Sequence, residues 1–323
     1  MKSRSLVMIA LACAWLPIAA AAQSWPAKPI RVIVPYPPGG LFDAIFRPLA
    51  RELGNALGQP VVLDNRPGGN TIIGMDLCAK APADGYTICG TSNDSMVLNP
   101  YLYAKLPYDP ERDFAPITNL LFTEEVIVAA AKTPFSNFRD MLAHARAKPG
   151  ALNFASFGQG SSAHMILAWI NNRAGVSITH VPYRGGGPSV AATLAGETEL
   201  CYMGIGALLP HIKAGRVKAL AVAQPARSPL LPEVPTMAEE GLDFPLKPWV
   251  AVIAPGATPE AIITRLAGEI GRILREPKFR DETLLRQGLE PVGNTPAQFA
   301  AFLKEERAIG SMLVKLSGIR LEQ

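Results

Sequence analysis

The chain has 323 residues, of which 49% are hydrophobic and 18% are charged. This length suffices for one large domain or two ordinary domains with a substantial buried core. The formal net charge of +4 is small, and the basic residues form no block, so the composition argues against a nucleic-acid partner.

The first 22 residues have the pattern of a secretory signal peptide. Lys2 and Arg4 give a positively charged start, residues 6–16 are apolar, and three alanines at 20–22 precede the cleavage site expected before Gln23. An uncleaved membrane anchor is the alternative, but the apolar run is short and ends in small residues, which favours cleavage. No later stretch is long and apolar enough to span a bilayer. We therefore expect an exported mature chain with a net charge of about +2, from 29 basic and 27 acidic residues.

Three cysteines follow the predicted signal peptide, too few for a disulfide-dense scaffold. Cys78 and Cys89 flank a turn at residues 83–85, and two interpretations stay open for them. They form a disulfide in an oxidising compartment, or they are small buried apolar side chains. Cys201 is left over in either case. No Cys-x-x-Cys pair or Cys/His cluster is present, so we predict no metal site.

Nine short runs predict β-strands, because they are apolar nearly throughout, as in strands that are covered on both faces of a parallel sheet. The predicted strands are Arg31–Pro35, Val61–Asn65, Thr87–Thr91, Val126–Ala130, Leu152–Ser156, Ile178–Pro182, Glu199–Met203, Val217–Ala223 and Val250–Ala254. Helical patterns lie between them. This alternation predicts an α/β fold with right-handed crossovers.

Three helix starts can be recognised. Ser136 is the expected N-cap of a helix over residues 137–147. Thr258 and Thr295 are each followed by a proline, a residue favoured at the first helical position. The helix after Thr295 is expected to reach about Lys315.

Two proline-rich irregular segments, residues 99–119 and 224–248, are the places where the chain could pass between domains. We therefore expect a discontinuous first domain formed by residues 23–119 and 224–323, and a second domain formed by residues 120–223. Two crossings of this kind would create a hinge and a cleft.

The first candidate site is a glycine-rich turn after the strand at 31–35. Gly39 and Gly40 let backbone N–H groups approach a ligand closely, and the following helix start adds unpaired donors and a positive dipole end. A tight turn without a ligand explains the pattern equally well. Asp43 suits the first turn of that helix, and it is also placed to receive a hydrogen bond from a ligand.

A second glycine-rich turn follows the strand at 152–156 and also precedes a helical pattern. Serine hydroxyls and backbone N–H groups would converge on an anion there. The candidate ligand-binding residues of this turn are Gly158, Ser161, Ser162 and His164. His164 has an alternative role, in which it bonds the backbone at the helix start.

The same turn matches a dinucleotide-binding fingerprint in its spacing Gly158-x-Gly160-x-x-Ala163. The acid expected about 20 residues later to hold a ribose is missing, because no Asp or Glu occurs before Glu197. Nucleophile-elbow, zinc-protease and P-loop motifs are also missing from the sequence. We therefore expect a binding protein that uses no cofactor, and a nucleotide-using α/β enzyme is the alternative.

A third turn begins with Tyr183 and Arg184 and continues with three glycines at 185–187 before an alanine-rich helix. A lone arginine is commonly a surface charge. Beside such a turn, Arg184 is equally suited to contact a carboxylate.

Ordered motifs run along the whole mature chain. They are Pro35-Tyr36-Pro37-Pro38-Gly39-Gly40-x-x-Asp43, Asn65-Arg66-Pro67-Gly68-Gly69-Asn70, Ala83-Asp84-Gly85-Tyr86-Thr87, Asn99-Pro100-x-Leu102-Tyr103, Gly158-x-Gly160-Ser161-Ser162-x-His164, His180-Val181-Pro182-Tyr183-Arg184-Gly185, Ala219-Leu220-Ala221-Val222 and Leu231-Pro232-x-Val234-Pro235-Thr236. Together they resemble the Bug family, the extracytoplasmic solute receptors of tripartite tricarboxylate transporters.

The resemblance implies a type II periplasmic binding-protein fold, in which two α/β domains close on a ligand at a hinge. It implies a periplasmic, monomeric receptor that passes a small carboxylate-bearing solute to membrane transporter subunits; a ligand sensor for a signalling partner is the alternative. The expected ligand-binding residues are Tyr36, Pro38, Gly39, Gly40, Leu41, Phe42, Asp43 and Ser92 in the first domain, and Gly158, Ser161, Ser162, His164, Tyr183 and Arg184 in the second.

The sequence departs from the family pattern after the first two glycines. Family members usually carry small or hydroxylated residues there, whereas this chain has Leu41 and Phe42. One hypothesis is an apolar pocket mouth for a ligand with a ring or an alkyl body, because apolar walls stabilise apolar surface by about 25 cal/mol per Å² removed from water. The alternative is that Leu41 or Phe42 points into the core of the domain.

Overall fold

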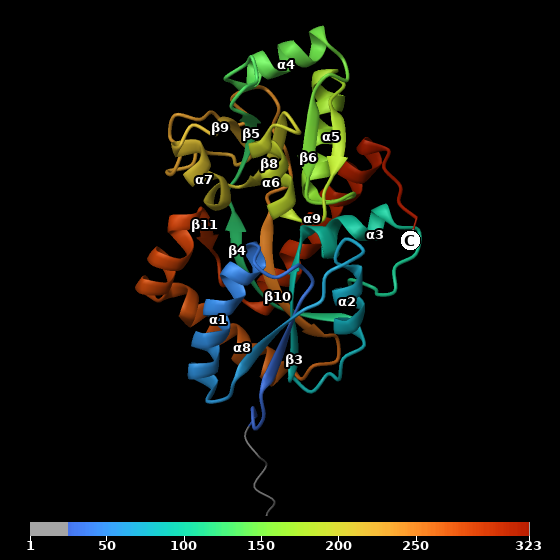
Figure 1. Ribbon diagram of the computed structural model, residues 1–323. Coiled ribbons are helices and arrows are strands. Elements are labelled where there is room, and N and C mark those ends of the chain that lie inside the picture. The colour runs from blue at the N-terminus through green and yellow to red at the C-terminus, as the bar shows by residue number, and fades with distance from the viewer. Residues whose placement is uncertain (1–24, 323) are drawn as a thin grey trace, which may run out of the picture.

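The computed structural model describes residues 25–322, which form two α/β halves stacked end to end (Figure 1). The signal peptide predicted at residues 1–22 lies outside the described residues. Within the described part of the chain, no helix combines the length and the apolar composition needed to cross a bilayer.

Within residues 25–322 the lower half in Figure 1 is built on a six-stranded mixed sheet with the order β11-β4-β10-β3-β1-β2. Strand β1 pairs in parallel with β2 and β3, and β10, β4 and β11 pair antiparallel to their neighbours. The strands are β1 (Ile30–Val34), β2 (Val61–Asn65), β3 (Thr87–Ser92), β4 (Phe114–Thr123), β10 (Trp249–Pro255) and β11 (Leu289–Pro291). The helical segments are α1 (Leu41–Leu57), α2 (Ile72–Ala79), η1 (Asp94–Leu98), α3 (Asn99–Leu102), α8 (Glu260–Arg275), η2 (Phe279–Leu284), η3 (Leu285–Gln287) and α9 (Pro296–Ser317).

The upper half contains, among the described residues, a five-stranded sheet with the order β7-β6-β8-β5-β9. Strand β6 pairs in parallel with β7 and β8, and β5 is antiparallel to β8 and β9. The strands are β5 (Glu125–Ala130), β6 (Asn153–Ser156), β7 (Thr179–Pro182), β8 (Leu200–Gly204) and β9 (Val217–Val222). The helices are α4 (Phe138–Ala147), α5 (Ser162–Ala174), α6 (Gly186–Ala195) and α7 (Ile205–Lys213).

All nine predicted strands are present, whereas β4 and β11 were not predicted. Strand β4 starts in the segment 99–119, which was expected to be irregular. Its pairing with β10 shifts register twice, and the extra residues Ile117 and Leu120 lie beside Pro116 and Asn119. A strand tolerates Pro and Asn best beside such bulges, which explains why the turn-forming residues concealed it.

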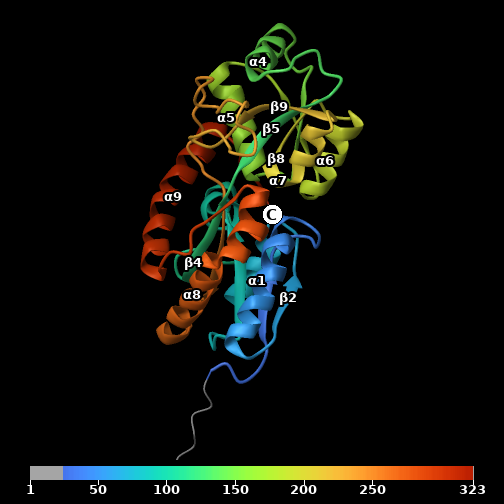
Figure 2. The ribbon, with the colours of Figure 1, turned by 90° about the vertical axis from the view of Figure 1, so that its left-hand side faces the viewer.

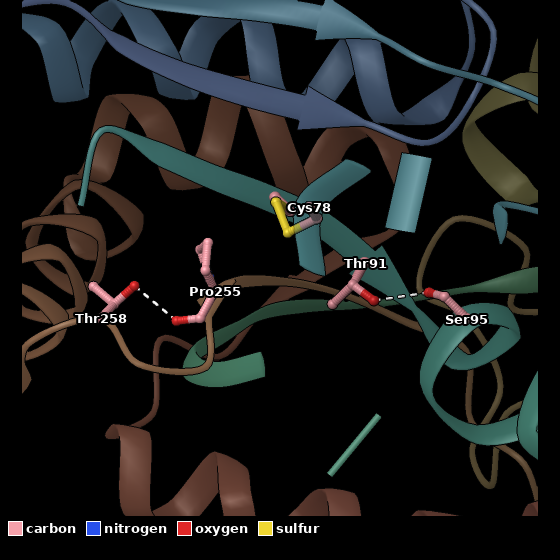
Figure 3. Close-up of a disulfide and its surroundings, with 6 residues drawn as sticks. Cys78, Thr91, Ser95, Pro255 and Thr258 are labelled. Carbon is pink, nitrogen blue, oxygen red and sulfur yellow. Dashed lines mark hydrogen bonds between the residues drawn. A yellow bond between two sulfur atoms is a disulfide. The ribbon is translucent and has the colours of Figure 1, made fainter. Parts of the chain in front are cut away.

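All three predicted helices are present and begin within one residue of the expected position, but the expected capping residue is correct only for α9. Thr295 caps α9 in a capping box with Gln298, and this helix reaches Ser317. Helix α4 is capped by Asn137, whose side chain accepts from the N–H of Asp140 at 2.8 Å, and not by Ser136. Thr258 does not cap α8, whose N-cap residue is Pro259; the hydroxyl of Thr258 donates to the carbonyl of Pro255 at 2.7 Å (Figure 3).

The chain passes between the two sheets at two places. The first crossing is at Glu124, between the end of β4 and the start of β5, so the boundary expected at 119/120 falls inside β4. After β9 the segment 224–246 stays with the second sheet, where Leu231 and Val234 pack in the same apolar cluster as Val222. The return therefore lies just before β10, about two dozen residues later than expected.

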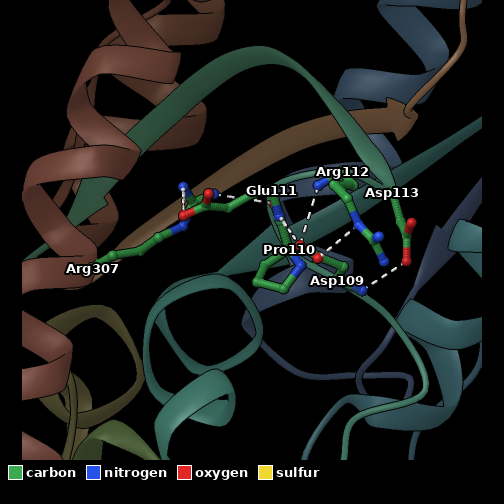
Figure 4. A network of polar contacts seen from close by, with 6 residues as sticks. All are labelled: Asp109, Pro110, Glu111, Arg112, Asp113 and Arg307. Atoms are coloured by element: carbon green, nitrogen blue, oxygen red, sulfur yellow. Dashed lines mark hydrogen bonds and ion pairs between the residues drawn. The ribbon is translucent and has the colours of Figure 1, made fainter.

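Three features brace the structure. Cys78 on α2 and Cys89 on β3 form a disulfide, which selects the first of their two interpretations (Figure 3); Cys201 is a buried thiol. Helix α9 packs against β4 of the first sheet and α5 of the second. Arg307 of α9 bonds Glu111 at 3.0 Å and the carbonyl of Pro110 at 3.1 Å, which holds the turn that precedes β4 (Figure 4).

Candidate functional site

The first glycine-rich turn connects β1 to α1 and presents open hydrogen-bond donors. Gly39 has a φ of 84°, a conformation that suits glycine, and Gly40 is the N-cap residue of α1. Both glycines are exposed. The first N–H groups of a helix have no partner inside the helix, and within residues 25–322 those of Gly40 and Leu41 meet no protein acceptor. The positive end of the α1 dipole is therefore accessible to an anion.

Asp43 holds this turn from inside the first domain. Its side chain is only 7% exposed. One oxygen accepts from the N–H of Gly39 at 2.9 Å and from Arg47 at 2.7 and 3.0 Å, and the other accepts from Asn65 at 2.9 Å. Burial alone would raise the pKa of Asp43, but the hydrogen bonds from Gly39, Asn65 and Arg47 lower it below its ordinary value. Both oxygens are engaged by the protein, so Asp43 shapes the turn.

Phe42 points into the core of the first domain. It is 5% exposed and stacks between Tyr36 and Phe46, with ring centroids 4.1 and 5.6 Å away. Leu41 is half-buried at the edge of the same apolar cluster. The core-directed alternative is therefore correct for Phe42, and the hypothesis of an apolar pocket mouth is left with Leu41 alone.

The ends of β1 and β3 bring Tyr36 and Ser92 together with a residue that was not predicted, Asp94. The hydroxyl of Tyr36 lies 2.7 Å from Oγ of Ser92 and 3.4 Å from a carboxylate oxygen of Asp94. Asp94 is 3% exposed. Burial raises the pKa of Asp94 to about 6, although hydrogen bonds from Ser162 and Tyr36 oppose this shift. An acid just after a parallel strand, beside Ser92, was the sequence signal for Asp94.

The second glycine-rich turn meets the first domain through that acid. The N–H of Ser162 donates to Oδ1 of Asp94 at 3.0 Å. The hydroxyl of Ser161 caps α5 and donates to the carbonyl of Gly158 at 2.7 Å. A Cβ on Gly160 would lie 3.0 Å from a methyl group of Leu102, so glycine lets this turn pack closely on the first domain. The start of α5 is therefore occupied by protein acceptors.

His164 supports this turn from behind. Its Nδ1 accepts from the N–H of Gly160 at 3.1 Å, and its ring stacks on His180 at 3.6 Å. Burial lowers the pKa of both histidines to about 4, and His180 contributes further to the shift of His164. The two rings line a cavity of about 420 Å³ that is completed by α5 and residues 316–319. The backbone-bonding alternative thus describes His164.

The third turn lies across the domain boundary from the first. Gly185 is the N-cap of α6 with a φ of 106°. A Cβ on Gly185 would lie 3.7 Å from Cγ of Pro37, so the starts of α6 and α1 approach each other (Figure 2). Tyr183 is half-buried beside the apolar cluster of the second domain. Arg184 is exposed and forms no ion pair with any described residue.

The three turns and Asp94 make up the candidate site, which lies between the two sheets. Sequence reasoning located the turns but did not identify Asp94. Within residues 25–322 no group of three or more His, Cys, Asp or Glu side chains is arranged to hold a metal ion. The chemistry available is anion binding by backbone N–H groups and hydroxyls.

Comparison with known proteins identifies the family. A family model described as the tripartite tricarboxylate transporter family receptor matches residues 45–319. BugT of Bordetella pertussis is 37% identical over 324 residues, which cover 99% of each protein. A solved structure described as a periplasmic transporter superposes with a TM-score of 0.87 at 35% identity, covering 92% of this chain and 99% of its own.

A protein of R. palustris solved with adipate superposes with a TM-score of 0.86 at 30% identity, covering 93% of this chain and 100% of its own. These likenesses confirm the type II periplasmic binding-protein fold. The matching family is one of transporter receptors, so a binding protein is confirmed over an enzyme. The chain belongs to the tripartite tricarboxylate transporter receptor family, as its ordered motifs predicted.

Proposed function

We propose that this protein is a periplasmic receptor that captures a small carboxylate-bearing solute between its two domains and delivers it to a tripartite tricarboxylate-type transporter. The observation that carries the proposal is the open start of α1 at Gly40 and Leu41, which faces the start of α6 across the domain boundary. Backbone N–H groups at a helix start bind carboxylates through charge-assisted hydrogen bonds. The R. palustris relative solved with adipate supports a carboxylate as the ligand.

Capture requires the two halves to move, and the connectivity permits this. Only the crossings at Glu124 and just before Trp249 join the two sheets along the described chain, and helix α9 lies against both halves. A ligand that bonds the turns of both domains would favour the closed arrangement, as in hinge closure of periplasmic binding proteins. Membrane subunits of the transporter would then recognise the closed receptor.

Native mass spectrometry of the mature protein as purified, followed by calorimetric titration of the recovered compound, tests this function. We expect a small organic acid whose binding raises the melting temperature and compacts the protein in small-angle scattering. Failure of a broad panel of mono-, di- and tricarboxylates to bind, with a different compound class recovered instead, would contradict the proposal.

A further inference from the structure

The start of α5 already holds a carboxylate that the protein itself supplies. Oδ1 of Asp94 accepts from the N–H of Ser162 at 3.0 Å, and 68 positions of sequence separate the two residues. Asp94 comes from the first domain and Ser162 from the second. The helix start at Ser162 in the second domain is therefore filled by a carboxylate from across the domain boundary.

This part of the site is rich in buried acids and poor in positive charge. Asp94 is 3% exposed and Glu125, at the first crossing, is 6% exposed. Their protein partners are the N–H of Ser162 and the hydroxyls of Tyr36 and Thr123. Within residues 25–322 no Lys, Arg or His side chain bonds either carboxylate. Burying charge without a counter-ion is unfavourable, so a further negative group would be disfavoured here.

Two neighbouring polar atoms have no partner except each other. Oε2 of Glu125 and the hydroxyl of Tyr202 are buried side by side in a contact short of good hydrogen-bond geometry, and no other described residue bonds either atom. Burial chiefly, and the charge of Asp94 in addition, raises the pKa of Glu125 to about 7. Burial, followed by Glu125 and then Asp94, raises the pKa of Tyr202 well above its ordinary value. Asp94, Glu125 and Tyr202 thus form one electrostatically connected group.

We propose that Asp94 is a specificity-determining residue: it takes the place of a second ligand carboxylate at Ser162, so the site accepts monocarboxylates and rejects dicarboxylates. The single ligand carboxylate binds the open donors at Gly40 and Leu41. The other end of the ligand, which lies toward Asp94, is neutral or positively charged. A second carboxylate would lose the N–H of Ser162 and meet the like charge of Asp94. This inference rests on the proposed function and narrows its ligand class.

The test compares acids that share a carbon skeleton and differ at one end. The dicarboxylate adipate is compared with hexanoate and ε-aminocaproate. In the same way, terephthalate is compared with benzoate, and succinate with butyrate. Calorimetric titration of the mature wild-type protein should show at least about tenfold tighter binding of a monocarboxylate than of the matched dicarboxylate. In Asp94→Ser, which removes the charge and opens the N–H of Ser162, the preference should shrink by about tenfold or reverse.

Two further variants complete the design. Asp94→Asn keeps the shape of the side chain and an acceptor for the N–H of Ser162 but removes the charge. It should therefore also weaken the preference for monocarboxylates. This second variant keeps the test valid if Asp94→Ser fails to fold. Asp243→Asn removes one negative charge from an exposed position and should leave the preference unchanged. A wild-type protein that binds dicarboxylates as tightly as their partners, or Asp94 variants with an unaltered preference, would overturn the inference and leave the proposed function standing. Failure of every acid to bind wild type would overturn both.

Discussion

The turn before α1 and the turn before α5 look alike in sequence but differ in what they offer a ligand. Each follows a strand, contains glycines and opens a helix. At α1 the acid that shapes the turn, Asp43, bonds the N–H of Gly39 from behind and leaves the helix start open. At α5 an acid from the other domain, Asp94, bonds the helix start itself. The availability of the donors therefore depends on acids that lie outside the glycine motif.

The largest effect is expected when the first turn is converted into a copy of the second. Gly40 has a φ of −92°, and a Cβ there would meet only the carbonyl oxygen of Pro37, at 3.8 Å, so Gly40→Asp fits without strain. The new carboxylate would cap α1 and occupy the donors at its start. Two charge-assisted hydrogen bonds to the ligand, at roughly 1.5–3 kcal/mol each, would be lost, and affinity should fall by at least about a hundredfold.

Gly40→Ala is the matched control, because it adds the Cβ without the carboxylate. Calorimetry on both variants should separate the charge from the steric change, and thermal unfolding of Gly40→Asp should show unchanged or increased stability. Equal losses of affinity in the two variants would show that space, and not the open helix start, governs binding at this turn.

The sequence predicts most of the strands and both glycine-rich turns, but it does not show which turn keeps open donors. The strands that were predicted are short continuous apolar runs, whereas β4 was concealed by Pro116 and Asn119 beside its bulges. The glycine turns could be located because their function depends on backbone shape. The contact between Asp94 and Ser162 could not, since it depends on how the two domains meet. The inward direction of Phe42 was readable, because Phe42 shares a helical stripe with Phe46 and Leu49.

Removal of the acid behind the open turn should cost stability. Asp43→Asn leaves Arg47 without its ion pair and replaces one acceptor by a donor that faces the N–H of Gly39. The loss of hydrogen bonds to a buried charged group should lower the free energy of unfolding by about 2–3 kcal/mol. Urea unfolding at neutral pH measures this.

Asp64→Asn on β2 is the control for Asp43→Asn. Asp64 also pairs with two arginines, Arg31 and Arg66, but its side chain is 25% exposed. Exposed ion pairs contribute about 0–1 kcal/mol, so Asp64→Asn should lower the free energy of unfolding by less than Asp43→Asn does. If Asp43→Asn lowers the free energy of unfolding by less than Asp64→Asn, Asp43 does not shape the turn.

The two acids should also respond to pH in opposite ways. The pKa of Asp43 is lowered in the folded protein, so the stability that Asp43 provides is present above the pKa of the unfolded chain and is lost as the pH falls through the folded value. The pKa of Asp94 is raised to about 6, because burial disfavours its charged form. The folded state then binds the extra proton, and stability falls as the pH rises from about 4 to about 6.

Unfolding experiments at pH 4 and pH 8 test this opposition. Asp94→Asn cannot ionise, so its stability relative to wild type should be greater at pH 8 than at pH 4, by about 1–3 kcal/mol. Asp43→Asn should show the opposite dependence: its deficit should persist from pH 8 down to pH 4 and shrink only when the pH falls below about 3.8. The other titratable groups near Asp94 are Tyr36, Tyr103, Tyr108, Glu125 and Tyr202. Burial raises the pKa of Glu125 to about 7, so Glu125→Gln is needed to subtract the contribution of Glu125.

The smallest effect on ligand affinity is expected at His164, although its sequence position first suggested a ligand contact. Its ring bonds the N–H of Gly160 and stacks on His180 on the side of the turn that faces the 420 Å³ cavity, and not on the side of Asp94. His164→Ala should destabilise the protein by about 1–2 kcal/mol, through one lost hydrogen bond and a lost stacked pair. Affinity for the ligand should change less than about threefold, because the N–H of Ser162 remains occupied by Asp94. A loss of affinity as large as that of Gly40→Asp, measured by calorimetry at a temperature where both variants are folded, would place His164 in the ligand site and show that the second turn opens when ligand binds.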